Sequence, residues 1–179
     1  TGLTIFWPDE ALDEGPILLQ KQVEIGPHDT LGSLYFNHLF PMGVDAMMEA
    51  VDLVRAGKAP RIPQDESQAT YESWCRKADA EIDWNKPVVE VYNLIRGTDP
   101  QPGAWTLFDG NELQIYDSRP GEGSGEPGTV LALTGDGFEV AARDGSIAIK
   151  RVRPKGGKKM DAGAFAREAG LREGARLGA

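Results

Sequence analysis

The stretch Trp7-Pro8-Asp9-Glu10-Ala11-Leu12-Asp13-Glu14-Gly15-Pro16-Ile17-Leu18-Leu19-Gln20 joins two apolar runs through an acidic loop. The runs, residues 3–7 and 17–23, are rich in aliphatic and aromatic residues and predict strands. Residues 8–16 are acidic and end in Gly-Pro, which is typical of a loop. The pattern therefore predicts a strand, an exposed acidic loop (residues 8–16) and a second strand.

Four carboxylates lie in the acidic loop, those of Asp9, Glu10, Asp13 and Glu14. In open α/β sheets, ligands bind near the carboxyl ends of strands, and the first predicted strand ends where this loop begins. A carboxylate placed there can accept a proton from an attacking amine or water. A developing oxyanion needs a hydrogen-bond donor, which these acidic side chains do not supply. Simple surface charge is the alternative for Asp9 and Glu10.

Two helices are predicted after the second strand. Asp29 and Thr30 suit a helix N-cap, and apolar residues then recur at helical spacing. Pro41 is predicted to interrupt this helix and to lie in the first turn of a new one, which covers residues 42–56 and ends at Gly57. The apolar face of the second helix, including its methionines, is predicted to cover a sheet rather than to form a binding surface.

The middle of the chain is predicted to be a linker followed by a helix. Residues 58–73 hold two prolines, several polar residues and no apolar periodicity, which is typical of an extended segment between domains. Asn85-Lys86-Pro87 then suits the start of a helix that Gly97 ends. The predicted domain limits are 1–57, a linker over 58–81, and 82–179.

The second predicted domain has the pattern of a small barrel. Three Asp-Gly pairs, which are strong turn signals, separate short alternating runs. The predicted strands cover residues 104–108, 112–117, 128–133, 138–142 and 146–153. Short strands joined by tight turns favour a small barrel. Asp161 is predicted to cap a last helix, and residues 172–179 are predicted to form a frayed tail.

The composition is typical of a globular protein. The net charge of −9 argues against strong nonspecific binding to nucleic acid. There is no signal-peptide pattern and no apolar run of about 18 residues, so we predict no membrane contact. A lone cysteine, Cys75, agrees with a reducing cytoplasm. Two histidines and one cysteine at unrelated spacings predict no metal site, and His38 lies on an amphipathic helix where we expect no catalytic role.

One segment is strongly basic in this acidic chain. Residues 143–159 hold seven bases and one acid. A patch for an anionic ligand and a solvated strand edge, where lysines block edge-to-edge pairing, explain this composition equally well. The candidate patch residues are Lys150, Arg151, Arg153, Lys158 and Lys159.

The acidic loop resembles the active-site loop of the 10-formyltetrahydrofolate-dependent formyltransferase family. Asp13-Glu14-Gly15-Pro16-Ile17-Leu18 is similar to the family's Asp-x-Gly-[Asp/Pro]-[Ile/Leu] element, in which threonine often stands in the place of Glu14. Other similar segments follow in the family's order: Asp29-Thr30-Leu31, Gly57-Lys58-Ala59, Pro63-Gln64, Ala69-Thr70-Tyr71, Ile82-Asp83-Trp84 and Ile95-Arg96-Gly97. The resemblance implies an α/β plus β fold, in which the C-terminal part of a Rossmann-like formyltransferase domain precedes a small OB-like barrel.

The resemblance also implies a co-substrate and a site. The co-substrate is 10-formyltetrahydrofolate, with no metal, and Asp13 is the catalytic carboxylate. Asp9, Glu10, Ala11 and Leu12 are the implied lining of the pterin pocket, mainly through their backbone groups.

Different parts of the chain are similar to different members of the family. Pro154-Lys155-Gly156-Gly157-Lys158-Lys159-Met160 resembles the terminal basic element of methionyl-tRNA formyltransferase, whereas the stretches 96–100 and 102–105 look more like the hydrolase domain of 10-formyltetrahydrofolate dehydrogenase. The first likeness favours formyl transfer to an amine, with initiator methionyl-tRNA as acceptor and partner. The second favours hydrolysis, with water as acceptor. An accessory module that binds RNA or a protein through its barrel is the alternative outside catalysis.

The family's Asn-x-His pair and its Ser-Leu-Leu-Pro type segment, both expected upstream of the loop, have no counterpart in these 179 residues. We therefore expect the chain alone to be catalytically incomplete. The expected protein partners are the N-terminal half of the family's domain or a second copy of the chain.

Overall fold

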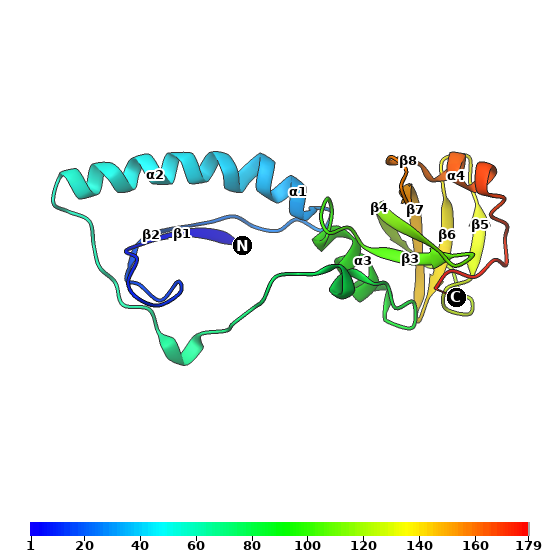
Figure 1. Ribbon diagram of the computed structural model, residues 1–179, viewed down its shortest axis with the longest axis horizontal. Coiled ribbons are helices and arrows are strands. Elements are labelled where there is room, and N and C mark those ends of the chain that lie inside the picture. Colours follow the sequence, from blue (N-terminus) through cyan, green and yellow to red (C-terminus); the bar gives the residue numbers. More distant parts are fainter. Residues whose placement is uncertain (179) are drawn as a thin grey trace. The chain divides into compact units, whose positions relative to one another are not determined.

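The computed structural model describes residues 1–178 and divides into two compact units, Thr1–Ser73 and Trp74–Ala179 (Figure 1). The division falls inside the segment that the sequence predicts as a linker. That segment contains two short 3-10 helices, η2 (Glu66–Gln68) and η3 (Lys77–Ala80). Among the described residues, no helix has the length and apolar character needed to cross a bilayer.

The first unit begins with the two predicted strands. β1 (Gly2–Phe6) and β2 (Ile17–Gln22) pair antiparallel and are joined by the acidic loop. The predicted helix N-cap is confirmed at Thr30, which begins α1 (Leu31–Leu34). Its hydroxyl accepts a hydrogen bond from the Ser33 amide, and the Ser33 hydroxyl accepts one from the Thr30 amide, both at 3.0 Å, which forms a capping box. The confirmed elements are one strand pair and a helix, and they do not make a Rossmann-like parallel sheet.

Pro41 does not separate two helices, contrary to the sequence prediction. α1 continues through a π-helical turn, η1 (Tyr35–Leu39), directly into α2 (Phe40–Arg55). The Phe40 amide donates to the carbonyl of Tyr35, five residues earlier. Proline has no N–H and its ring clashes with the carbonyl four residues before it in an α-helix. The wider turn just before Pro41 lets the chain remain helical.

The predicted burial of the apolar face of α2 is wrong for this chain. α2 lies beside β1 and β2 and buries Ala46 and Ala50 (Figure 1), while Lys21 of β2 forms an ion pair with Glu49. Met47 and Met48 are 53% and 61% exposed, so they are not core residues. Exposed apolar side chains continue along the same helical segment, at Tyr35, Phe36, Phe40, Val44, Val51 and Val54.

We expect the first unit to be far less protected than the second in amide hydrogen exchange. A two-stranded sheet and a helix with an exposed apolar face bury little surface, whereas the second unit has a continuous core. Amides of β4 and β7 should exchange only by global unfolding of the second unit, which typically needs about 5–15 kcal/mol. Equal protection of β1 and β7 in a monomer would contradict this expectation, and protection of β1 gained only at high concentration would indicate a second copy.

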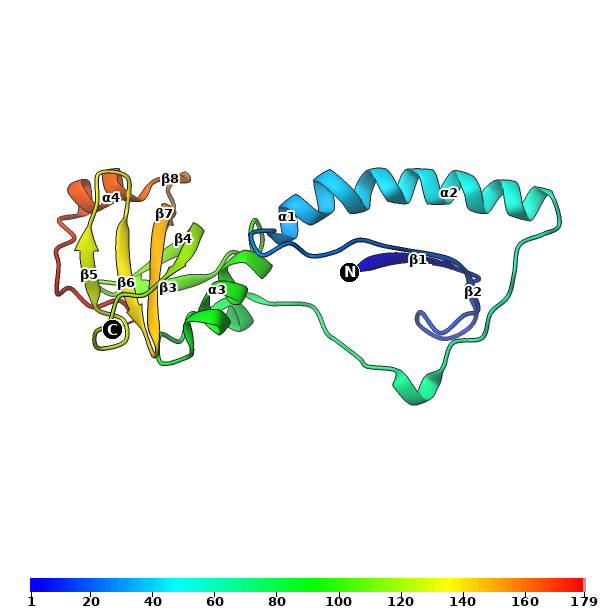
Figure 2. The ribbon, with the colours of Figure 1, turned by 180° about the vertical axis from the view of Figure 1, so that it is seen from behind.

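The second unit is a curled antiparallel sheet flanked by helices (Figure 2). The strand order is β3-β4-β7-β6-β5, and β8 pairs with β7. The elements are α3 (Val88–Gly97), β3 (Trp105–Phe108), β4 (Asn111–Gly121), β5 (Val130–Leu133), β6 (Phe138–Ala142), β7 (Gly145–Pro154), β8 (Met160–Asp161) and α4 (Ala162–Ala169). This half-barrel is consistent with the predicted small barrel, and its five main strands coincide with the five predicted ones.

The core of the second unit fills the curl of the sheet. Ile115, Ile147 and Val152 are fully buried there, with Ile95 of α3 and Phe165 of α4 packed against them. Trp84 is also buried, and its indole N–H donates to the hydroxyl of Thr106 at 3.0 Å. Pairing this buried polar group removes the cost of leaving it without a hydrogen bond.

Besides the cap at Thr30, local turn and cap signals were correct at two further places and wrong at one. Asp109 and Gly110 have φ angles of 47° and 70°, as a two-residue hairpin of type I′ between β3 and β4 requires. Asp161 caps α4 by accepting a hydrogen bond from the Ala164 amide at 2.9 Å. Asn85 does not cap α3. The first amide of α3, that of Val88, donates instead to the Asp144 carboxylate at 2.7 Å.

The predicted frayed tail is wrong over residues 172–178. The amides of Gly174 and Leu177 donate to the carbonyls of Val130 and Gly128, both at 2.8 Å. Leu177 is 3% exposed and belongs to the core. Because its backbone pairs along β5 and its leucine is buried, the tail is part of the half-barrel.

Candidate functional site

The ends of the acidic loop are held close together. The Trp7 amide donates to the carbonyl of Pro16 at 2.9 Å, which closes the loop just beyond the two strands. Gly15 is buried, and a Cβ atom there would lie 1.7 Å from the Trp7 carbonyl oxygen. Only glycine allows this close backbone approach, which explains the Gly in the loop motif.

The loop between these ends displays its acidic side chains on the surface. Asp9, Glu10, Asp13 and Glu14 are all exposed, and Leu12 is 71% exposed. The Asp9 carboxylate accepts a hydrogen bond from the Ala11 amide at 3.1 Å, which forms a local turn. The predicted residues 9–13 therefore lie together on one exposed turn.

Asp13 has an unusual backbone conformation. Its φ of 59° lies in the left-handed region, which is costly for residues other than glycine, although aspartate tolerates it better than most. Among residues 1–178, which the structure describes, no group forms a hydrogen bond or ion pair with the Asp13 carboxylate. The carboxylate is thus presented to whatever binds at the loop.

A segment distant in sequence, residues 60–64, supports the loop. The Trp7 indole N–H donates to the Pro60 carbonyl at 2.8 Å, and the Arg61 guanidinium lies 4.2 Å from the indole ring centre. Ile17 and Ile62 exchange backbone hydrogen bonds of 2.8 and 3.0 Å. The Gln64 amide then reaches the loop backbone. Sequence reasoning missed this support. The resemblance marked Pro63-Gln64 as a similar segment, but it did not indicate a contact between Gln64 and the loop.

The described residues offer carboxylates but few other catalytic groups at this loop. His38 is exposed on η1. Within residues 1–178, no three His, Cys, Asp or Glu side chains gather in a way that could hold a metal ion. An open hollow of about 590 Å³ lies on β1 and β2, but it is lined by residues 1–4 and 20–24, away from the loop. The loop can therefore accept a proton, and it needs other groups to stabilise an oxyanion.

The predicted basic residues lie in the second unit, on β7 and on the segment leading to β8. Lys150 pairs with Asp136 at 3.2 Å, Lys159 pairs with Asp99 at 3.0 Å, and the Arg153 Nε donates to the Gln114 side chain at 2.6 Å. In the described part of the chain, Arg151, Lys155 and Lys158 are exposed and have no ion pair. The six bases of residues 150–159 thus divide into three with partners and three whose charges face solvent.

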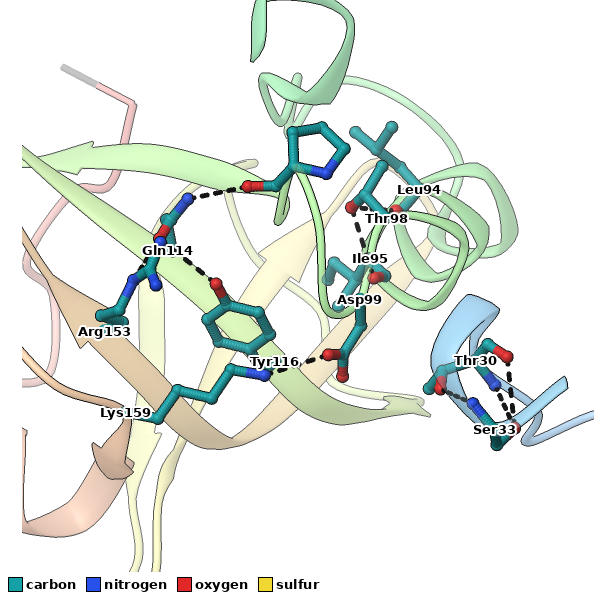
Figure 3. A network of polar contacts seen from close by, with 11 residues as sticks. Thr30, Ser33, Leu94, Ile95, Thr98, Asp99, Gln114, Tyr116, Arg153 and Lys159 are labelled. Atoms are coloured by element: carbon teal, nitrogen blue, oxygen red, sulfur yellow. Dashed lines mark hydrogen bonds and ion pairs between the residues drawn. The ribbon is translucent and has the colours of Figure 1, made fainter. Parts of the chain in front are cut away.

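Two of the partnered bases, Arg153 and Lys159, contact a polar layer formed by Gln114 and Tyr116 of β4 (Figure 3). The Tyr116 hydroxyl donates to Gln114 at 3.2 Å, and the Lys159 ammonium lies 3.5 Å from the Tyr116 ring centre. Burial raises the pKa of the Tyr116 hydroxyl. A Cβ at Gly103 would lie 2.6 Å from that hydroxyl, so the connection between α3 and β3 needs a glycine to pack against Tyr116. These contacts give Arg153 and Lys159 a structural role in the half-barrel.

Comparison with known families gives two matches in chain order. The model described as "Formyl transferase" matches residues 1–51, and "Formyl transferase, C-terminal domain" matches residues 75–170. The first match contains the acidic loop, and the second contains the half-barrel with its basic residues.

Curated relatives come from two kinds of protein. A methionyl-tRNA formyltransferase of Geotalea daltonii is 40% identical over 99% of this chain and 57% of its own length. The mitochondrial 10-formyltetrahydrofolate dehydrogenase of Homo sapiens is 41% identical over 92% of this chain and 19% of its own length. The chain therefore spans just over half of the first relative and about a fifth of the second.

Solved structures share the fold. HypX from Aquifex aeolicus, crystallised in complex with tetrahydrofolic acid, has a TM-score of 0.75 at 24% identity, over 93% of this chain and 30% of that protein. An N-formyltransferase from Helicobacter canadensis has a TM-score of 0.57 at 20% identity, over 89% and 55% of the two chains. At this level of identity, these likenesses concern the fold alone.

Proposed function

Because this chain belongs to the formyl transferase family, we propose that it forms part of an enzyme that transfers a formyl group from 10-formyltetrahydrofolate, with Asp13 as the carboxylate that moves the proton. The observation that carries this proposal is the acidic loop. It lies within the matched residues 1–51, and its tightly closed backbone presents the Asp13 carboxylate without a competing partner among the described residues.

The chemistry assigns one proton to Asp13. An amine nitrogen attacks the formyl carbon, the bond from that carbon to the folate nitrogen breaks, and the attacking amine loses a proton. A carboxylate within hydrogen-bond reach accepts that proton, and the folate nitrogen leaves as an amine after gaining one. The backbone of residues 9–12 contacts the pterin in this proposal. The donor that stabilises the formyl oxyanion comes from outside the described loop.

The proposed acceptor is the amine of methionyl-tRNA. The relative from Geotalea daltonii bears the name of that activity and matches this chain over 99% of its residues. The exposed charges of Arg151, Lys155 and Lys158 give the otherwise acidic chain a surface that suits RNA phosphates. In this proposal Lys150, Arg153 and Lys159 contribute long-range charge while they keep their structural partners.

Hydrolysis of 10-formyltetrahydrofolate is the second candidate function. The dehydrogenase relative has nearly the same identity to this chain as the tRNA enzyme, and a water acceptor needs no basic surface. A purely RNA-binding module has weaker support. Among the described residues of the half-barrel strands, no aromatic side chain belongs to the exposed large hydrophobics that could form a stacking platform.

Product analysis is expected to separate the two enzymatic functions. A full-length family protein that contains this chain, incubated with 10-formyltetrahydrofolate and methionyl-tRNA, should form formylmethionyl-tRNA at typical enzymatic rates of about 1–10³ s⁻¹. Without tRNA, formate release should be slower by at least about tenfold, because the site is then not complementary to a water acceptor. Equal formate release with and without tRNA would favour the hydrolase.

The proposal also covers the domain limits, the location and a protein partner. Residues 1–57 are assigned to a Rossmann-like catalytic domain, residues 58–81 to the linker and residues 82–179 to an OB-like barrel. A cytoplasmic location and a protein partner for the exposed face of α2 belong to the same proposal.

A further inference from the structure

One side chain outside the acidic loop is bonded to two of the loop's carbonyls. The Nε2 group of Gln64 donates to the carbonyl oxygens of Asp13 and Gly15, each at 2.8 Å. A primary amide carries two N–H groups on its nitrogen, so both donors are used on the loop. Gln64 therefore fixes the turn on both sides of Glu14.

We infer that Gln64 is a positioning residue that holds Asp13 in its left-handed backbone conformation. The functional part of this inference rests on the proposed role of Asp13. A non-glycine residue at a φ of 59° persists where the surrounding structure over-determines its conformation. Gln64 supplies part of that constraint, because its hydrogen bonds orient the peptides that follow Asp13 and Gly15, while the bond from the Trp7 amide to the Pro16 carbonyl fixes the ends of the loop.

Gln64 is itself held by a well-anchored backbone. Ile62, two residues before Gln64, exchanges backbone hydrogen bonds with Ile17 at the start of β2. The Trp7 indole N–H attaches the same segment at Pro60. Both anchors lie at the ends of the loop, so Gln64 reaches the Asp13 turn from a support that moves with the loop.

Positioning matters because proton transfer depends steeply on distance. A displacement of about 1 Å in a catalytic group can cost about a hundredfold in rate. An exposed carboxylate on a turn with a costly φ has no packing of its own to prevent such a displacement. The two amide hydrogen bonds of Gln64 take the place of that packing.

The hold on the loop can be tested on the 179-residue chain. Gln64→Met keeps the length of the side chain and removes both donors. Gln68→Met is the matched control, because the Gln68 amide donates to the Asp65 carboxylate and not to the loop. A positive φ brings the amide and Hα protons of a residue close together, which gives a strong NOE between them. At Asp13 this NOE should weaken in Gln64→Met and persist in Gln68→Met. A full NOE in Gln64→Met overturns the inference.

The functional consequence is tested by a double-mutant cycle in a full-length family protein that contains this chain. Gln64→Met should lower the kcat of formyl transfer by about 10- to 100-fold. In an Asp13→Asn background it should cause no further loss, because a residue that acts through Asp13 has nothing left to position. Additive losses would identify Gln64 as a general support of the fold and overturn its positioning role.

The two experiments keep the inference and the proposed function separate. If Asp13→Asn leaves turnover unchanged, the proposed role of Asp13 fails, while the NOE still decides whether Gln64 holds the loop. If Asp13→Asn abolishes turnover and Gln64→Met has no effect on kcat, the proposed function stands and the positioning role of Gln64 is overturned.

Discussion

Asp13→Asn is expected to lower the kcat of formyl transfer by about 10²–10⁴ while binding of 10-formyltetrahydrofolate persists. Asparagine has the size of aspartate and tolerates the left-handed conformation, so the loop backbone and its bonds to Gln64 stay in place. The amide cannot accept the proton of the attacking amine. The kcat is measured by single-turnover formyl transfer and the Kd by calorimetric titration, both in a full-length family protein that contains this chain.

Glu14→Gln is the matched control for this variant. Glu14 is the next residue in the same loop, is also exposed, and loses the same charge in the substitution. It should leave kcat unchanged, because no proton is assigned to it. Equal losses of binding and turnover in Asp13→Asn would instead make Asp13 a structural residue of the loop.

The triple variant Arg151→Ala, Lys155→Ala and Lys158→Ala is expected to weaken tRNA binding by about 10²–10³ at 0.1 M salt. Each phosphate contact contributes about −0.7 to −0.9 to the slope of log affinity against log salt, so three contacts account for about 2–3 units of slope. These three side chains make no ion pair with the described residues, so the half-barrel should remain folded. The measurement is the tRNA Kd over a series of salt concentrations.

The matched control removes three positive charges elsewhere in the second unit. Lys86→Ala, Arg167→Ala and Arg172→Ala change the net charge equally but lie outside residues 150–159. This control should lower affinity only slightly and keep most of the salt slope. If the slope of the patch variant also stays at its original value, tRNA does not bind the basic segment, and the hydrolase becomes the favoured function.

Local sequence signals predicted the elements whose causes are local. The N-cap at Thr30, the hairpin at Asp109-Gly110 and the cap at Asp161 each depend on residues within a few positions. The loop between β1 and β2 was predicted for the same reason, because its acidic residues and Gly-Pro end exclude regular structure.

The missed features depend on contacts distant in the sequence. The apolar spacing of α2 indicates that the helix is amphipathic, but it does not say whether this chain covers the apolar face, and here Met47 and Met48 are exposed. The tail lacks periodicity, so nothing local indicates that Leu177 is buried against the half-barrel. Gln64 lies 51 residues from Asp13, and their contact has no local signature.

For the candidate site, the sequence offered residue identities and the structure added geometry. The resemblance selected Asp13 among four carboxylates, whose composition alone does not distinguish them. The left-handed φ of Asp13 and the close approach at Gly15 could not be predicted from charge or spacing, because both arise from how the loop closes on Trp7. The catalytic role of Asp13 stays a prediction.

The π-helical turn at Tyr35–Leu39 sets the rotational phase between α1 and α2. An α-helix advances about 100° per residue, and a π turn accommodates one additional residue without passing that rotation on to the helix beyond it. Losing one residue within the turn would therefore restore α-helical hydrogen bonding and leave Ala46 and Ala50 facing the strands. Losing one residue a turn later, inside α2, would rotate everything beyond it by about 100° and turn Ala50 away from the strands. The same one-residue deletion is thus expected to be tolerated before Phe40 and to be disruptive after Pro41.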